Sequence, residues 1–292
     1  MLATVLAGLL TLFDPASPAL AQAAVVRSHY LRTGDGVRLH YLEAGPRGRK
    51  SARHTIILIP GWSMPASIWS AQLSDLGRHW RIIALDPRGQ GRSSVPLQGF
   101  HVDRRADDIH ELLKMAPGSI LVGWSLGALE ALNVVHRHGE RLIAGLMVVD
   151  SSIGEGPPSA SGGFVGELRA DRAGALDAFL KAIFATAQPA RLHDRLLRQA
   201  LRMPLESSIA LFPSTVPREQ WRDTVRGLRK PFAYVITPRY GVQARALAEA
   251  RPDARIEIFE DAGHALFVDD APRFNRLLGE FAARIWEQRA PR

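Results

Sequence analysis

The chain has 292 residues, which is enough for one large domain or two smaller ones. Its 46% apolar and 23% charged residues are ordinary for a folded soluble protein and exclude disordered, collagen-like and coiled-coil chains. It has no cysteine, which excludes disulfides, thiolate zinc sites, iron–sulfur clusters and a cysteine nucleophile, and its net charge of +8 is scattered without runs, which favours a solvated surface over a nucleic-acid partner.

The chain begins with an apolar run over residues 1–13, which an Asp-Pro pair ends. The run is shorter than the stretch of about 20 apolar residues that a membrane span needs. It leads to Ala21-Gln22-Ala23, the small-x-small pattern at which signal peptidases cut. We therefore expect a secretory signal over 1–23 and a periplasmic or secreted mature protein with no stable membrane span. The run lacks the usual preceding Lys or Arg, so an apolar N-terminal helix or a membrane anchor is the alternative.

Strand and helix patterns alternate through the first half of the chain. Two alternating runs in residues 27–44 are joined by Gly34-Asp35-Gly36, which predicts a β-hairpin. Short apolar strands and helical stretches then follow one another, which predicts a mostly parallel sheet with helices on both faces. The strands are expected at 55–59, 81–85, 119–123 and 142–149, and the helices at 66–78, 103–115 and 126–138.

This alternation stops at residue 151. A loop rich in Gly, Pro and Ser comes first, and only helical patterns follow as far as residue 229. Because an open parallel sheet binds its ligand at the carboxyl ends of its strands, we expect residues 151–229 to form a helical lid there, whose inner face shapes the substrate pocket. The core would then comprise residues 24–150 and 230–292. Its last elements are expected as strands at 232–237 and 255–259 and helices at 242–250 and 272–287.

One helix of the expected lid, near residues 191–202, has an arginine-rich face. A solvated outer face is the favoured interpretation, with Leu192, Leu196 and Leu201 packing inward. Binding of an anionic substrate or a membrane surface is the alternative. The arginines, at spacings of four, three and four, are Arg191, Arg195, Arg198 and Arg202.

The strongest chemical signal is Gly123-Trp124-Ser125-Leu126-Gly127, which lies between an expected strand and an expected helix. In this context a GxSxG sequence predicts a sharp, strained turn that projects the serine hydroxyl above the sheet. The two glycines let the strand and the helix approach each other. Ser125 is therefore the candidate nucleophile, at a helix N-terminus that favours developing negative charge.

Two further loops follow strand ends. Gly61-Trp62 follows the strand at 55–59, and we expect the backbone N–H of Trp62 to form an oxyanion hole with that of Leu126. The loop at 86–93 contains Asp86 and Arg88, which look catalytic but are expected to hold the turn through an ion pair.

Gly263-His264 follows the last expected strand. Histidine is the natural general base at neutral pH, so His264 is the candidate base. The order of a serine, an acid and then this histidine fits the triad that accompanies a GxSxG turn.

Taken together, these motifs resemble those of the α/β-hydrolase superfamily, in particular its lidded branch around non-haem haloperoxidases, esterases and C–C hydrolases. The resemblance covers about residues 30–150 and 230–290. It implies an α/β fold with a mostly parallel twisted sheet flanked by helices and a helical lid inserted after the sixth strand. The motifs are PGWSMPASIW at 60–69, DPRGQGRS at 86–93, GWSLG at 123–127 and DAGHALFVDD at 261–270.

The sequence departs from this family at two places. Pro60 precedes the oxyanion glycine, where the family usually has histidine. More importantly, the triad acid usually follows the strand that here spans 232–237, and this chain has no Asp or Glu between that strand and Glu249. The acid must therefore lie elsewhere, or the triad is incomplete.

The best candidate for the acid is Asp150, at the carboxyl end of the expected strand at 142–149. Neighbouring parallel strands lie about 4.8 Å apart, so a carboxylate one strand away can still reach the imidazole, and the superfamily contains members with the acid at this position. A purely structural role for Asp150 is the alternative. The rivals fit other roles: Asp261 shapes its loop, Asp270 caps a helix, and Glu130 lies more than a turn down the helix after Ser125.

These observations predict an exported serine hydrolase that cleaves a small-molecule carboxylic ester through Ser125, His264, Asp150 and an acyl-enzyme. The alternatives are perhydrolysis, thioester hydrolysis or C–C bond hydrolysis on the same fold, or a non-catalytic binding protein. No cofactor, metal or nucleic-acid partner is expected, and no oligomeric state is predicted. The side chains expected to line an apolar substrate pocket are Trp124, Leu266 and Phe267.

Overall fold

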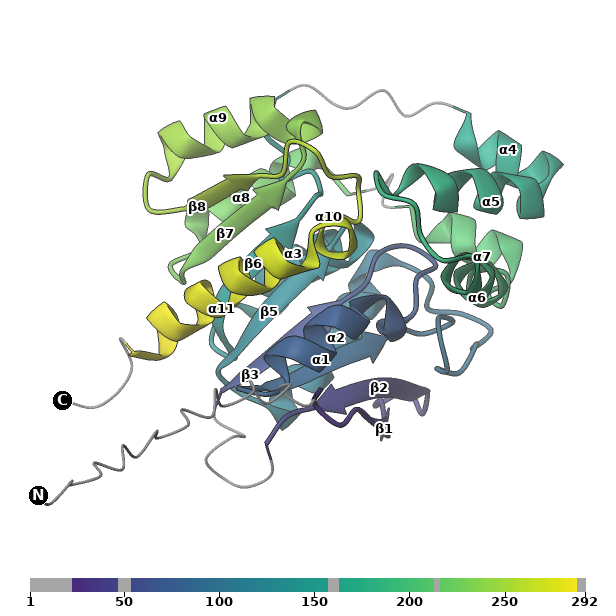
Figure 1. Cartoon of the computed structure of the whole chain (residues 1–292), viewed down its shortest axis with the longest axis horizontal. Helices are drawn as coiled ribbons and strands as arrows, with labels where there is room; N and C mark the ends of the chain where they lie inside the picture. The colour runs from purple at the N-terminus through teal and green to yellow at the C-terminus, as the bar shows by residue number, and fades with distance from the viewer. Residues whose placement is uncertain (1–22, 47–53, 157–162, 213–215, 288–292) are drawn as a thin grey trace, which may run out of the picture.

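The computed structural model describes residues 23–46, 54–156, 163–212 and 216–287. Within these residues, eight strands form one sheet in the order β1-β2-β4-β3-β5-β6-β7-β8 (Figure 1). The β1–β2 hairpin is antiparallel, as is the pair of β2 with β4, and all later pairs are parallel. The strands are β1 Arg27–Arg32, β2 Arg38–Ala44, β3 Thr55–Ile59, β4 Arg81–Asp86, β5 Ser119–Trp124, β6 Ile143–Val149, β7 Phe232–Ile236 and β8 Arg255–Ile258.

The sheet has an apolar core on each face, because its central strands are apolar at successive positions. In β3, Ile56 and Leu58 belong to one core and Ile57 and Ile59 to the other. The first core contains η2, α1 and α11, and the second contains α2, α3, α8 and α9. These helices are η2 Ala66–Trp69, α1 Ser70–Leu76, α2 Val102–Met115, α3 Leu126–His138, α8 Arg218–Gly227, α9 Gly241–Ala250 and α11 Ala271–Glu287.

The predicted α/β class and mostly parallel sheet are confirmed, and most expected boundaries lie within one residue of the observed ones. One element differs in kind. The helix expected over 66–78 is a short 3-10 turn followed by an α-helix that ends at Leu76. A carboxylate oxygen of Asp86 accepts the backbone N–H of Ala66 at 2.5 Å, so the turn begins on the loop that follows β4.

Between β6 and β7 the described residues form helices and the connections between them. Figure 1 shows α4 to α7 grouped on one side of the sheet, apart from the helices that cover its faces. The helix α8 falls inside the expected lid range of 151–229, yet it packs against α3, where Trp221 and Val225 enter the second core. The group beside the sheet is therefore α4 Phe164–Ala170, α5 Arg172–Ala182, α6 Ala190–Ala200 and α7 Leu205–Ala210.

The arginine-rich face lies on α6. All four arginines are exposed, and Arg202, which follows α6, also donates to the carbonyls of Gly91 and Ser93. On the other side of α6, Leu196 is fully buried. The expectation that Leu201 packs inward is wrong, because it caps the end of α6 and is 37% exposed.

Candidate active site

Ser125 stands at the turn between β5 and α3. Its backbone has φ 55° and ψ −122°, a conformation that non-glycine residues rarely adopt. The backbone of this turn is closely packed on both sides of the serine. A Cβ at Gly123 would lie 2.4 Å from the carbonyl oxygen of Gly127, and one at Gly127 would lie 2.5 Å from that of Pro60. The strained turn therefore depends on both glycines.

Two hydrogen bonds connect Ser125, His264 and Asp150. The Nε2 atom of His264 lies 2.9 Å from Ser125 Oγ, and its Nδ1 lies 2.6 Å from Asp150 Oδ2. A carboxylate can only accept, so Nδ1 carries the proton and Nε2 is free to accept the proton of the serine hydroxyl. The structure thus brings together the three side chains that were singled out from the sequence.

Asp150 is held firmly in this arrangement. It is 1% exposed, and its Oδ1 accepts the backbone N–H of Thr237 at 2.7 Å and the hydroxyl of the same residue at 2.9 Å. Its backbone has φ 40°. Thr237 directly follows β7, the strand after which the resembling family usually has its acid. In this chain that position instead supplies the two donors that orient the carboxylate of Asp150.

The rival acids have other partners. A carboxylate oxygen of Asp270 accepts the backbone N–H of Arg273 at 3.1 Å in the first turn of α11, as an N-cap does. Glu130 is fully buried and forms an ion pair with Arg105. In the 86–93 loop, Asp86 contacts His40 at 2.6 Å, while Arg88 pairs with Asp108 at 2.6 Å. Asp86 and Arg88 thus have structural partners, as expected, but they pair with His40 and Asp108 and not with each other.

The loop of His264 is anchored by Asp269, a residue that the sequence analysis did not single out. A carboxylate oxygen of Asp269 accepts the backbone N–H of Gly263 at 2.8 Å and that of Ala185, beyond α5, at 2.9 Å. The indole of Trp124 donates to the carbonyl of His264 at 2.7 Å. The position of the imidazole therefore depends on the core and on the helices beside the sheet.

The expected oxyanion loop lies directly beside Ser125. A Cβ at Gly61 would be 3.1 Å from Ser125 Cβ, so only glycine fits without displacement. Within the described residues, the backbone N–H groups of Trp62 and of Leu126, the first residue of α3, donate to no protein acceptor. Both are therefore free for a ligand. Ser63 has φ 58°, and its buried hydroxyl has no partner in the described chain.

The side chain of Trp62 is enclosed by helices α4 to α7 and their connections. Its indole nitrogen donates to the carbonyl of Ser208 at 2.6 Å, and its ring stacks on Phe212 with centroids 5.2 Å apart. Phe164 and Phe179 meet the same ring edge-on. Trp62, whose backbone N–H is the expected oxyanion donor, thus connects the loop after β3 to this group of helices.

The three expected pocket residues have the contacts of core residues. Trp124 is 1% exposed, and Leu266 and Phe267 are fully buried. The ring of Phe267 stacks on Trp69 with centroids 3.8 Å apart and meets Trp124 edge-on. These contacts form a packed layer beneath His264, which accounts for the apolar residues in the motif at 261–270.

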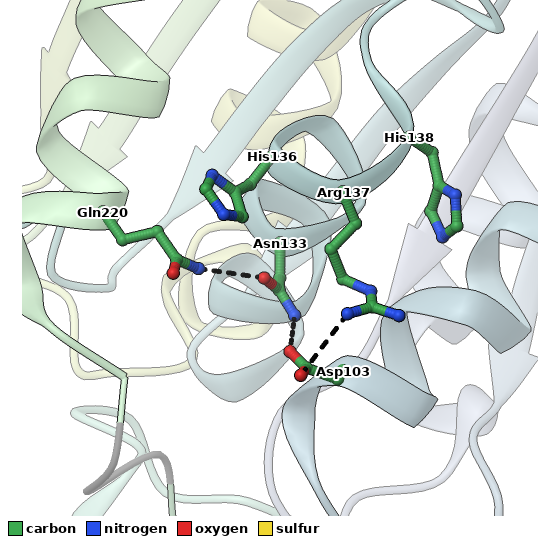
Figure 2. Close-up of a pocket in the computed structure, with 6 residues that line it drawn as sticks. All are labelled: Asp103, Asn133, His136, Arg137, His138 and Gln220. Carbon is green, nitrogen blue, oxygen red and sulfur yellow. Dashed lines mark hydrogen bonds and ion pairs between the residues drawn. The ribbon is translucent and has the colours of Figure 1, made fainter.

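A hollow of about 320 Å³ lies away from Ser125, and its lining residues are shown in Figure 2. Its polar groups bond to one another. Asn133 donates to Asp103 at 2.8 Å and accepts from Gln220 at 3.0 Å, while Arg137 pairs with Asp103 at 3.4 Å. This hollow therefore lies where α2, α3 and α8 pack together, and Ser125, His264 and Asp150 are not among its lining residues.

Two other features of the described residues are relevant to the site. They contain no group of three or more His, Asp or Glu placed to hold a metal ion. None of the helices in the described ranges has both the length and the apolar character that a bilayer span requires.

Ser125 lies on a strained strand–helix turn at the carboxyl edge of a mostly parallel sheet, and hydrogen bonds connect it through His264 to Asp150. This arrangement is typical of serine hydrolases. Residues 56–277 match the model of the Alpha/beta hydrolase family. The chain therefore belongs to this family and is a serine hydrolase.

The chain is also similar to named hydrolases and to solved structures of esterases. The chain is 28% identical over 247 residues to pimeloyl-[acyl-carrier protein] methyl ester esterase of Citrobacter koseri, covering 79% of this chain and 94% of that one. It is 28% identical over 261 residues to N-formylmaleamate deformylase of Pseudomonas putida, with coverage of 85% and 94%. A Burkholderia cenocepacia structure assigned as an aryl esterase superposes with a TM-score of 0.78 at 28% identity, covering 89% of this chain and 100% of that one.

Proposed function

We propose that this protein is an exported esterase that cleaves a small carboxylic ester through Ser125, His264 and Asp150. The observation that carries the proposal is the continuous pair of hydrogen bonds from Ser125 Oγ through the imidazole to Asp150, 2.9 and 2.6 Å long. Two of the similar proteins are esterases by name, which supports ester cleavage. Their names specify different esters, a pimeloyl methyl ester in one case and an aryl ester in the other, so the proposal commits to the ester bond and not to one substrate.

In the proposed reaction, Ser125 Oγ attacks the ester carbonyl carbon while His264 Nε2 takes the hydroxyl proton. The oxygen that becomes negative is stabilised by the N–H groups of Trp62 and Leu126. Collapse of this intermediate breaks the bond to the alcohol, which leaves with the proton from His264. The acyl group remains on Ser125 until a water molecule, deprotonated by His264, attacks its carbonyl carbon. The bond to Ser125 Oγ then breaks, His264 returns the proton to Oγ, and the acid is released.

The test uses a fluorophosphonate probe and p-nitrophenyl esters of graded chain length. The wild-type protein should be labelled, and Ser125→Ala and His264→Ala should each lose at least about 10³-fold in turnover while remaining folded. Thioester and N-formyl amide substrates in the same panel distinguish ester cleavage from related chemistry. A Ser125→Ala protein that keeps more than about a tenth of the wild-type rate, far above that loss, would rule out the proposed mechanism.

A further inference from the structure

Gln90, in the loop that follows β4, is a buried side chain that the reaction above does not use. It is 1% exposed. Its amide nitrogen donates to two backbone carbonyls of the oxyanion loop, that of Gly61 at 3.1 Å and that of Met64 at 2.6 Å. The two acceptors stand on either side of Trp62 and Ser63. One buried amide thus ties down both ends of the segment that offers an oxyanion N–H.

The orientation of this amide is itself fixed. Arg105 of α2 donates from Nη1 to the amide oxygen of Gln90 at 3.0 Å, which leaves the amide nitrogen facing the two carbonyls. The Nη2 of Arg105 donates to Glu130 Oε2 at 3.3 Å, and the two side chains form an ion pair; Glu130 lies on α3, the helix that begins directly after Ser125. Arg105 is 1% exposed and Glu130 is fully buried. A buried network whose members bond to one another is rigid.

The charges of this network are held away from water. Burial raises the pKa of Glu130 to about 7, although the neighbouring Arg105 lowers it. Burial likewise lowers the pKa of Arg105, against the opposing effect of Glu130. Apolar side chains of the same size would avoid this desolvation. The network is therefore better explained by the geometry it imposes on Gln90 than by a gain in stability.

The geometry of the peptide bond gives Gln90 a specific effect. The carbonyl of Gly61 and the N–H of Trp62 belong to one planar trans peptide, so they point in opposite directions. Fixing the carbonyl oxygen therefore fixes the direction of the N–H. The next residue, Ser63, has φ 58°, a conformation that persists only when its surroundings over-determine it. Without Gln90, the Met64 N–H, 3.2 Å from the Gly61 oxygen, would be the remaining hydrogen bond to that carbonyl in the described chain.

We infer that Gln90 is a positioning residue, which holds the Gly61–Trp62 peptide so that its N–H points at the oxyanion of the tetrahedral intermediate. Arg105 and Glu130 hold the amide of Gln90 in the orientation that this role needs. The inference rests on the proposed function, because the oxyanion forms only if Ser125 attacks the carbonyl carbon of an ester. It predicts that loss of Gln90 weakens binding of the transition state and leaves substrate binding nearly unchanged.

The experiment compares Gln90→Met with Gln72→Met. Gln72 is a matched control, because it is also fully buried and donates from its amide to a backbone carbonyl, that of Phe267, at 2.9 Å. For each folded variant we would measure kcat and KM for a p-nitrophenyl ester. We would also measure Ki for a trifluoromethyl ketone, whose adduct with Ser125 places a negative oxygen in the oxyanion hole.

For Gln90→Met we expect kcat to fall about 10- to 100-fold, which is somewhat less than the loss that removal of an oxyanion donor causes. The Ki of the trifluoromethyl ketone should rise by the same factor, and KM should change less than about threefold. Gln72→Met should change kcat and Ki by less than about threefold. Equal losses in both variants would mean that Gln90 is only structural and would overturn the inference.

A second variant keeps the test decisive if Gln90→Met does not fold. Gln90→Glu retains the acceptor for Arg105 and removes the donor to the carbonyls, so it should show the same loss at pH 8. Wild-type kcat and Ki in either folded Gln90 variant would overturn the inference, while fluorophosphonate labelling of wild-type Ser125 would leave the proposed function standing. If the wild-type protein itself is not labelled, the proposed function fails first and the inference fails with it.

Discussion

At Asp150 the two carboxylate oxygens have separate tasks. Oδ1 accepts both donors of Thr237, and Oδ2 accepts from His264. In Asp150→Asn, the amide oxygen can keep the bonds to Thr237, which places the amide N–H against Nδ1 of His264. The imidazole must then carry its proton on Nε2 and can no longer accept one from Ser125. We expect turnover to fall about 10³- to 10⁴-fold with the fold intact.

The same substitution at the rival acid is a matched control for this prediction. Asp270 caps α11, and asparagine caps helices as well as aspartate does, so Asp270→Asn should change turnover and thermal stability little. Ester hydrolysis and circular dichroism on both proteins decide the matter. Loss of a triad member lowers turnover by far more than about tenfold. A folded Asp150→Asn enzyme whose rate is within about tenfold of wild type would therefore show that Asp150 has a purely structural role.

At the scale of elements, helices α4 to α7 and their connections contact residues beside Ser125 and His264. They hold Trp62 through Ser208 and three phenylalanines, and the connection after α5 bonds to Asp269 on the histidine loop. The sequence predicts a lid whose inner face shapes the pocket. The observed contacts add that these helices also position residues of the proposed chemistry.

We therefore expect Phe212→Ala to lower kcat for short and long esters alike, by several-fold. Loss of a stacked ring weakens the hold on Trp62 by about 0.5–1.5 kcal/mol, independently of acyl length. The measurement compares p-nitrophenyl acetate with the octanoate. Leu201→Ala, on the same lid but 37% exposed, is the control and should change neither rate. A Phe212→Ala effect confined to the octanoate would show that the lid acts through the pocket alone.

At the scale of the whole molecule, the prediction of export concerns residues 1–23, nearly all of which lie outside the described residues. Directly after the expected cleavage site, the backbone nitrogen of Ala24 donates to the carbonyl of Ser74 at 3.2 Å. Cleavage after Ala23 would leave this nitrogen in place as an amine that can still donate. We expect N-terminal sequencing of the native protein from the periplasm or medium to begin at Ala24. A soluble cytoplasmic product that retains Met1 would contradict export.

The sequence alone determined the class of fold and was enough to propose Ser125, His264 and Asp150, because both inferences depend on local patterns. Apolar strands alternating with helices require a covered parallel sheet. The turn at Ser125 needs glycines within two positions of the serine, and they are visible in the chain. Asp150 and His264 could be placed because carboxyl ends of parallel strands meet at one edge. The fold class follows the prediction, and the three side chains meet in the structure.

Only the tertiary structure decided which side chains support that chemistry. The indole of Trp62 finds its acceptor 146 positions away, on Ser208, and Gln90 reaches back 29 positions to Gly61. Leu266 and Phe267 match an apolar pocket as well as a core, and only packing against Trp69 separates the two. Such partners depend on the direction of individual side chains across the folded sheet. Local hydrophobic and turn patterns do not specify that direction.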